Sequence, residues 1–393
     1  MIGRSLVFTT KYGRRQGVLA ALLLLFLPVA PSWSVRAQDK TGDQFVEAVA
    51  ARFYAWDLDH NQTLSMPELD VAIKDPVNTG RSAAALAALK RASLSTNYTL
   101  PPLTFNNIRE LAGRPPAGHQ PNLARLYLDG LRRINGLTNG ELFASGLPRL
   151  DTIRQGRIGD CFCLAPIGAM LHRDPQEVAS MFSMEGGYHC VVKIGSEAVL
   201  VALPTDAERA MGRMANNSHD GLWLDLYEEA MGQLHNSLKS PDQQSYSSVE
   251  AIASGGSAGR IISDLTGHKV SGFSLEFGKN PGAPAALQDT RLAALRRKLA
   301  DATGQKRLVT CSTQQSTTPG LTPHHVYALL GYDPINDTIE LWNPHGNEFA
   351  PKGPPGPANG YPTRRGLFTI PVPEFVQQFS GMAFEGMELA AHR

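Results

Sequence analysis

The sequence predicts an α+β protein in which an all-helical N-terminal region precedes a two-lobed core. Helical apolar periodicity covers 42–56 and 83–92 near the N-terminus, and after about Leu150 it returns at 162–172, 223–234 and 289–301. Apolar runs of strand type follow at 307–312, 325–332, 338–342 and 367–370. A helix-rich half followed by a strand-rich half is typical of an α+β domain with two lobes, and a functional site is expected in the cleft between them.

The composition suits a globular protein and argues against binding to nucleic acid. The 393 residues are 42% hydrophobic and 19% charged, enough apolar material for two domains of ordinary size. Residues 1–37 carry five basic residues and no acid, so the remaining chain holds 32 bases against 36 acids, a net charge of −4. Such a chain has no basic footprint for a phosphate backbone or a membrane surface.

The first 37 residues have the pattern of a secretory signal peptide. A basic segment ending at Arg15 precedes the apolar run 17–30, and small residues lead to Ala37, where cleavage is expected. The apolar run is shorter than the roughly 20 residues that span a bilayer, and no later run is long enough. Export to the periplasm, the cell surface or the medium is therefore expected.

The loop 57–68 carries oxygen ligands at alternate positions between two helical segments. They are Asp57, Asp59, Asn61, the Thr63 carbonyl, Ser65 through a water, and a bidentate Glu68. The pattern suits a hard cation that takes six to eight oxygens and resembles the EF-hand calcium loop. Gln62 stands where that loop normally has glycine at a positive φ, a departure that costs of order 1 kcal/mol. Ca²⁺ is the only cofactor that the sequence implies.

A second helix–loop–helix resembles a partner hand without its chemistry. Thr99-Leu100 repeats Thr63-Leu64 after the helical run 83–92 and before another at 105–111. The ligand positions of this loop hold Ser93, Ser95, Pro101 and Thr104, so no carboxylate is present for Ca²⁺. We therefore expect an EF-hand pair over 38–112, and then a linker over 113–149 that contains a short amphipathic helix near 123–131.

The run 155–165 carries the clearest chemical signal. Two glycines precede Cys161, and an apolar helix begins there, so the helix dipole and free N–H groups are expected to lower the pKa of the thiol. The side-chain amide of Gln155 and the Cys161 N–H could together bind an oxyanion. The other cysteines, Cys163, Cys190 and Cys311, are expected to be core thiols or to include one disulfide pair that the sequence does not identify.

Two later strands supply a histidine and an asparagine. His325 begins one strand, Asn343 ends the next, and the turn 333–337 makes the two strands antiparallel neighbours. Asn343 could then orient the imidazole, as in the Cys-His-Asn triad of papain-like proteases. The adjacent His324 is the rival for the role of His325.

On these residues, the chain from about Leu150 to Phe384 resembles the catalytic core of calpain-type cysteine proteases, and the catalytic domain is expected over 150–393. The resemblance rests on 155–165, 222–230, 253–267, His325-Val-Tyr with Asn343-Pro, and 366–375. It implies a papain-like core with a helical Cys lobe and an antiparallel β lobe. It also implies Cys161 as nucleophile, His325 as general acid/base, Asn343 as its orienting partner and Gln155 as oxyanion donor. Tyr327 follows His325 at the family spacing, which favours His325 over His324.

Several residues depart from the family pattern. Phe162 and His345 stand where the family has tryptophan, and Pro166 falls in the first turns of the helix. Thr152 and Gly221 replace two acidic positions that bind calcium in calpain cores, which argues against calcium activation of the core itself.

The sequence as a whole predicts an exported, calcium-binding cysteine endopeptidase that acts on proteins or peptides. One alternative is a secreted calcium-binding module whose protease-like fold is inactive and serves as a binding surface. Another is a different acyl transfer on the same triad, such as transglutamination.

Overall fold

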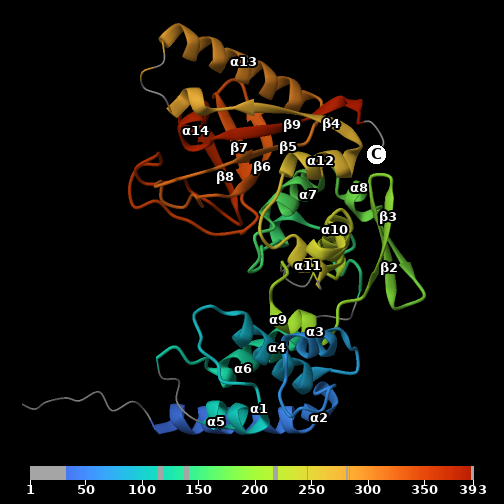
Figure 1. Cartoon of the computed structure of the whole chain (residues 1–393). Coiled ribbons are helices and arrows are strands. Elements are labelled where there is room, and N and C mark those ends of the chain that lie inside the picture. The colour runs from blue at the N-terminus through green and yellow to red at the C-terminus, as the bar shows by residue number, and fades with distance from the viewer. Residues whose placement is uncertain are drawn as a thin grey trace, which may run out of the picture.

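The computed structural model describes residues 32–113, 118–136, 141–215, 220–245, 247–279, 282 and 284–390. Residues 1–31, which include most of the predicted signal peptide, lie outside this range. The α+β class predicted from the sequence is confirmed, since a helical region precedes a core with two antiparallel sheets (Figure 1). No helix among the described residues is both long enough and apolar enough to span a bilayer.

The N-terminal region packs its helices around one apolar cluster. Its helices are α1 (Ser32–Ala50), α2 (Phe53–Trp56), α3 (Met66–Lys74), α4 (Gly80–Leu94), α5 (Phe105–Gly113) and α6 (Leu123–Asn135). The central helix is α4, whose alanine-rich stretch 83–88 is almost completely buried. Small side chains let neighbouring helices approach closely, as where Gly130 of α6 lies against Ala84. The segment predicted as a linker thus contributes α6 to this region.

A helix from far along the chain completes the N-terminal cluster. Helix α9 (Asp206–Met211) belongs by sequence to the core, yet Ala207, Ala210 and Met211 are buried with α4 and α6. Figure 1 shows α9 lying at the boundary between the N-terminal helices and the core. The two parts of the molecule are therefore joined by apolar packing as well as by the chain.

The first lobe of the core surrounds helix α7 (Cys161–Arg173), which is buried from Cys161 to Leu171. Around it lie the 3₁₀ turn η1 (Leu150–Thr152) and helices α8 (Pro175–Ala179), α10 (Trp223–Ser237), α11 (Ser248–Ala251) and α12 (Ala258–Thr266). A further 3₁₀ turn, η2, spans Pro241–Gln243. A three-stranded antiparallel sheet of β1 (Phe182–Glu185), β2 (His189–Ile194) and β3 (Glu197–Ala202) flanks the lobe. The sequence analysis did not predict this small sheet.

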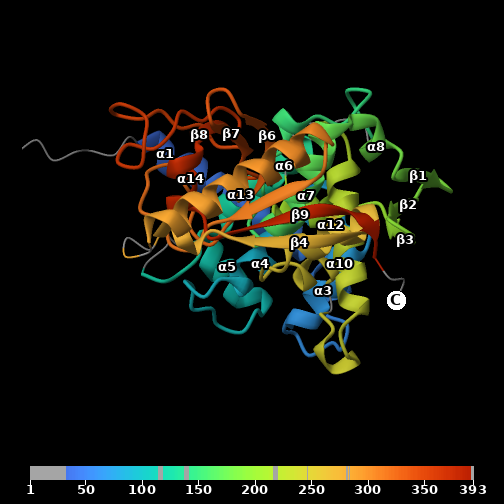
Figure 2. The ribbon, with the colours of Figure 1, turned by 90° about the horizontal axis from the view of Figure 1, so that it is seen from above.

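The second lobe is a six-stranded antiparallel sheet in the order β4-β9-β5-β6-β7-β8. Its strands are β4 (His268–Ser274), β5 (Val309–Ser312), β6 (Val326–Asp333), β7 (Thr338–Trp342), β8 (Leu367–Pro371) and β9 (Gly381–Leu389). Helix α13 (Ala285–Gly304) lies along the sheet in Figure 2, and η3 (Glu276–Lys279) and α14 (Val372–Gln378) complete the lobe. The four predicted strands are confirmed as β5 to β8, whereas β4 and β9 were not predicted.

Side chains of β6 point alternately into the apolar clusters of the two lobes, so the lobes lie side by side. Ala328 and Trp342 are buried in the cluster that contains α7, whereas Tyr327 and Leu329 are buried in the cluster that contains α13. Successive residues of a strand point to opposite faces, so β6 serves both cores at once. The start of β6 is thereby brought to the start of α7, which is where the candidate site lies.

Candidate functional site

The segment that leads into Cys161 is held by close backbone contacts that only glycine permits. A Cβ on Gly156 would lie 2.1 Å from the Arg213 carbonyl oxygen and 2.3 Å from that of Met214. The Arg157 N–H donates to the Arg213 oxygen at 2.9 Å, and the Gly159 N–H donates to the Ala253 oxygen at 2.7 Å. These contacts place Cys161 at the first position of α7, with Asp160 directly before the helix.

The thiol of Cys161 is buried, and burial raises its pKa. Hydrogen bonds from the N–H groups of Val326, Phe162 and Cys161 itself favour the thiolate, while the nearby Asp160 carboxylate opposes it. The expectation that the helix terminus would lower this pKa is wrong, because the loss of hydration outweighs the N–H groups. The contact with Val326 nevertheless shows that the sulfur lies at the first residue of β6.

His325 and Asn343 meet at the adjoining ends of β6 and β7. The two strands are antiparallel neighbours, as predicted, and their register pairs Ala328 with Trp342. The Nε2 of His325 lies 2.8 Å from the Oδ1 of Asn343. Because Oδ1 can only accept, Nε2 carries the proton in this bond and Nδ1 is left as a proton acceptor. His324 is exposed, with a positive φ of 50°, and does not share this contact.

The imidazole of His325 is enclosed by other aromatic rings. His345 stacks on it with ring centroids 4.3 Å apart, and Tyr327 meets it edge-on at 5.0 Å. Burial and then His345 lower the pKa of His325 to about 3, although its bond to Asn343 acts in the opposite direction. The imidazole is therefore neutral at neutral pH and able to accept a proton.

Gln155 lies beside Cys161, but its amide is fully engaged. Its Nε2 lies 2.9 Å from both the Ile158 carbonyl oxygen and the Oδ1 of Asp160. These two acceptors use both N–H bonds of the amide, and Oε1 is buried without a hydrogen-bond partner in the part of the chain that the structure describes. The backbone N–H of Gln155 donates to the Pro344 oxygen at 2.8 Å, which ties this loop to the segment that follows Asn343.

A pair of buried acids that was not predicted from the sequence includes the residue directly before Cys161. The carboxyl groups of Asp160 and Glu228 are within hydrogen-bond reach of each other, and both residues have no exposed surface. Burial raises the pKa of each. The available signal was Glu228 on the buried side of α10 and an acid next to Cys161, but spacing alone does not bring the two together.

In the N-terminal region, the loop 57–68 gathers three of its predicted ligands. Carboxylate oxygens of Asp57, Asp59 and Glu68 lie within 4.8 Å of one another. Asn61 is close by, since its Nδ2 donates to Asp59 at 2.8 Å and its Oδ1 accepts the N–H of Thr63. Gln62 has a φ of 65°, the conformation normally left to glycine. This cluster of hard oxygen donors fits Ca²⁺.

The same loop is braced by its own hydrogen bonds. Glu68 accepts the N–H groups of Leu58 and Ser65, each at 2.7 Å. Burial acts to raise the pKa of Glu68, but the hydrogen bonds from Ser65, Asp59 and Leu58 outweigh it and lower the pKa. The carboxylate is thus ionised and in place to bind a cation. The Leu64 N–H donates to the Leu103 oxygen, which links the loop to the second helix–loop–helix formed by α4 and α5.

The acids beside Thr152 and Gly221 have partners within the protein. Asp151 pairs with Arg149 at 3.0 Å and with Arg365, which lies just before β8 in the other lobe. Asp220 accepts the N–H of Arg149 at 2.9 Å and the hydroxyl of Thr152 at 3.3 Å. An ion pair between Asp151 and Arg365 therefore connects the two lobes here.

Comparison with known families identifies the family of the core. The sequence profile of the calpain family cysteine proteases matches residues 129–354, more than half of the chain. The match contains Cys161, His325 and Asn343 and excludes the loop 57–68. No curated protein matches the chain.

Proposed function

Because the chain belongs to the calpain family of cysteine proteases, we propose that it cleaves peptide bonds through Cys161, His325 and Asn343. One observation carries this proposal. The 2.8 Å contact between His325 and Asn343 lies at the start of β6, where the Val326 N–H reaches the sulfur of Cys161. A thiol, an imidazole with a free acceptor and an orienting amide are the parts that acyl transfer by cysteine requires.

In the proposed reaction, His325 Nδ1 takes the thiol proton as the sulfur attacks the substrate carbonyl carbon. The C=O π electrons move to oxygen, and this oxyanion is bound by the Cys161 N–H. Gln155 supplies a second donor once one of its N–H bonds leaves Ile158 or Asp160. His325 then protonates the leaving amine, and the C–N bond breaks to give a thioester. Water, activated by the same imidazole, hydrolyses the thioester and restores the thiol.

The neutral state of the free site follows from its burial. Since burial raises the pKa of Cys161 and lowers that of His325, the thiol and imidazole are both uncharged before substrate arrives. Attack and proton transfer are therefore coupled, and His345, stacked on the imidazole, helps to maintain this state.

Replacing Cys161 with alanine is expected to reduce the hydrolysis of unfolded casein under reducing conditions by about 10⁴-fold or more, because the nucleophile is lost. Cys163 offers a matched control, since it lies two residues away in the same helix and is completely buried. Cys163→Ala should retain hydrolysis. Absence of turnover in the folded wild-type protein would favour an inactive binding module, and incorporation of amines into protein would favour transglutamination.

We further propose that the protein is exported and that the loop 57–68 binds Ca²⁺ as the first of two EF-hands. The leader pattern over 1–37 supports export. The oxygen cluster of Asp57, Asp59 and Glu68 supports the calcium site, with Asn61 and the Thr63 carbonyl as further ligands. Calcium would neutralise the mutual repulsion of these carboxylates and stabilise the N-terminal region.

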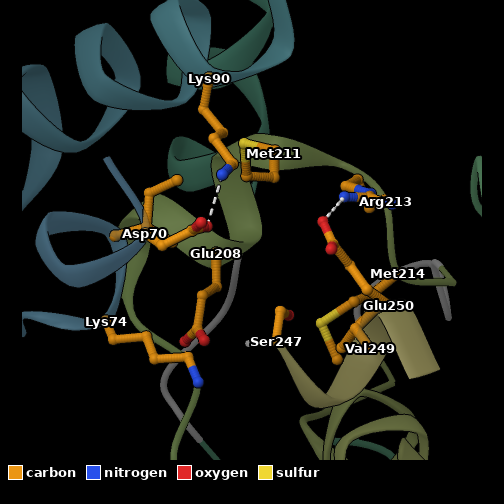
Figure 3. A pocket seen from close by; sticks show the side chains of 11 residues that line it. Asp70, Lys74, Lys90, Glu208, Met211, Arg213, Met214, Ser247, Val249 and Glu250 are labelled. Atoms are coloured by element: carbon orange, nitrogen blue, oxygen red, sulfur yellow. Dashed lines mark hydrogen bonds and ion pairs between the residues drawn. The ribbon is translucent and has the colours of Figure 1, made fainter. Parts of the chain in front are cut away.

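Contacts between α3, α9 and the Gln155 loop support a link from the calcium loop to the core. The hydroxyl of Thr205, which caps α9, donates to the Ile73 oxygen near the end of α3 at 2.6 Å. Beyond α9, the Arg213 oxygen accepts the N–H of Arg157. Figure 3 shows the pocket on this boundary, where Lys90 points toward Asp70 and Arg213 toward Glu250. Bound calcium would reduce the mobility of α3 and, through these contacts, the mobility of the loop that carries Gln155.

Substituting glycine for Gln62 is expected to tighten calcium binding about fivefold, because it relieves roughly 1 kcal/mol of strain at a positive φ. Glu68→Gln should abolish the calcium-dependent rise in melting temperature, since it removes one carboxylate of the cluster. Isothermal titration with CaCl₂ measures the first effect and differential scanning calorimetry the second. A melting temperature that does not respond to Ca²⁺ in the wild-type protein would contradict the site.

A further inference from the structure

Two carboxyl groups share an enclosed position directly behind Cys161. Asp160 and Glu228 have no exposed surface, and their carboxyl groups are within hydrogen-bond reach of each other. The Oδ2 of Asp160 is buried and has no hydrogen-bond donor within reach among the described residues. Glu228 accepts the Ala215 N–H, which lies 3.0 Å from one of its oxygens and 2.9 Å from the other.

The surroundings of this pair favour one shared proton. The charged groups that act most strongly on Glu228 are Asp160 and Asp225, both acidic. Burial first, and then Asp160, Glu228 and Asp264, disfavour the anionic forms of the neighbouring Cys163 and Tyr227. Two ionised carboxylates held in contact in a buried position would repel each other strongly. A proton between them turns that repulsion into a hydrogen bond.

The two acids also form hydrogen bonds with the Gln155 side chain and with the segment that packs against the Gln155 loop. Asp160 Oδ1 accepts from the Gln155 amide at 2.9 Å, and the Asp160 carbonyl accepts the N–H groups of Cys163 and Leu164 that begin α7. Glu228 holds Ala215, the end of the segment 213–215 whose first two carbonyls lie against Gly156. Movement of the pair would therefore displace both Gln155 and Cys161.

We infer that Asp160 and Glu228 form a positioning pair, held by one shared proton, that sets the Gln155 amide and limits the negative charge beside Cys161 to one. The inference builds on the proposed cysteine protease mechanism. A fully ionised pair would place a second negative charge next to the sulfur and make the thiolate harder to form. A neutral pair would make it easier.

Replacing a carboxyl group of the pair with its isosteric amide distinguishes a singly ionised pair from a doubly ionised one, because the two respond differently in the reactivity of Cys161. If the pair carries a single charge, Glu228→Gln leaves that charge on Asp160, and the pH midpoint of Cys161 alkylation by iodoacetamide stays within about 0.3 unit of wild type. The double variant Asp160→Asn/Glu228→Gln removes the charge, and its midpoint should fall by about one unit or more. A drop of that size in Glu228→Gln alone would show a doubly ionised pair and overturn the inference.

A second measurement does not depend on hydrolysis. The infrared band of buried protonated carboxylic acids should be present in the wild-type protein at pH 7 and lose intensity in Glu228→Gln, with Asp225, whose pKa burial raises to about 7, accounting for part of what remains. An equal band in the two proteins would also overturn the inference. Since alkylation and infrared spectra are read without substrate, they remain decisive even if the protein hydrolyses nothing.

The kinetic readout separates positioning from simple stabilisation. Glu228→Ala leaves Asp160 without its partner and should lower kcat by about 10- to 100-fold with little change in KM, because the lost contacts act on the transition state. Glu228→Gln keeps a hydrogen bond to Asp160 and should restore kcat to within about threefold of wild type. Equal kcat in a folded Glu228→Ala protein and in wild type would contradict a positioning role.

Discussion

Replacing His325 with alanine is expected to lower kcat/KM for a protein substrate by about 10³-fold or more, because the proton acceptor for the thiol is removed. The structure makes this loss specific to one of two adjacent histidines. His325 is buried and bonded to Asn343 at 2.8 Å, whereas His324 is exposed and turned into a left-handed backbone conformation. His324→Ala should therefore remain within about threefold of the wild-type kcat/KM.

The two alanine variants serve as controls for each other. Both remove an imidazole from the same short segment, so a general disturbance of β6 would affect both. Kinetics with a quenched fluorescent casein, together with a thermal melt of each variant, measures activity and folding side by side. Equal losses in the two variants, or full activity in folded His325→Ala, would rule out the assignment of His325.

Acid is expected to destabilise the protein by about 4 kcal/mol through His325 alone as the pH falls from 6.5 to 3. Burial and His345 lower the pKa of His325 from 6.5 to about 3 in the folded state. The unfolded chain therefore binds a proton at a pH where the folded protein does not. The contribution is fully present above pH 6.5 and is lost as the pH falls toward 3.

His325→Gln isolates this contribution, because glutamine does not titrate and can still bond to Asn343. Urea unfolding at pH 7 and 4.5 should show that the wild-type protein loses about 3 kcal/mol more than the variant over this interval. A Cys161→Ala background in both proteins removes coupling to the thiol proton. His345, whose pKa burial also lowers, acts on His325, so the difference between the two proteins reports the titration of this coupled pair. Identical losses in the two proteins would show that His325 is protonated in the fold.

Much of the site could be predicted from the sequence because it depends on local order along the chain. An apolar helix that begins at Cys161 was predicted from periodicity, and α7 begins at that residue. The hairpin of β6 and β7 was predicted from two apolar runs around a turn, and its register brings His325 to Asn343. Once two strands are adjacent and antiparallel, residues at their joined ends must meet.

Two of the strands that were not predicted from the sequence, β4 and β9, have partners far away in the chain. β9 pairs with β4 and β5, which lie at least 69 residues earlier in the chain (381 − 312), and its exposed end includes Met387 and Leu389. Pairing over such distances leaves little trace in local periodicity. β1 pairs with the neighbouring β2, but it exposes three of its four residues and so lacks the alternation of a half-buried strand.

The sequence by itself determined the α+β class, the helix that presents Cys161 and the hairpin that joins His325 to Asn343. Only the tertiary structure decided the charge state of the site. Burial raises the pKa of Cys161, whereas the helix terminus alone predicts a lower value. The packing of the chain also brings Asp160 into contact with Glu228, which lies on a different segment. Position along a helix or strand follows from short-range pattern, whereas hydration and charge depend on everything that surrounds a group after the chain has packed.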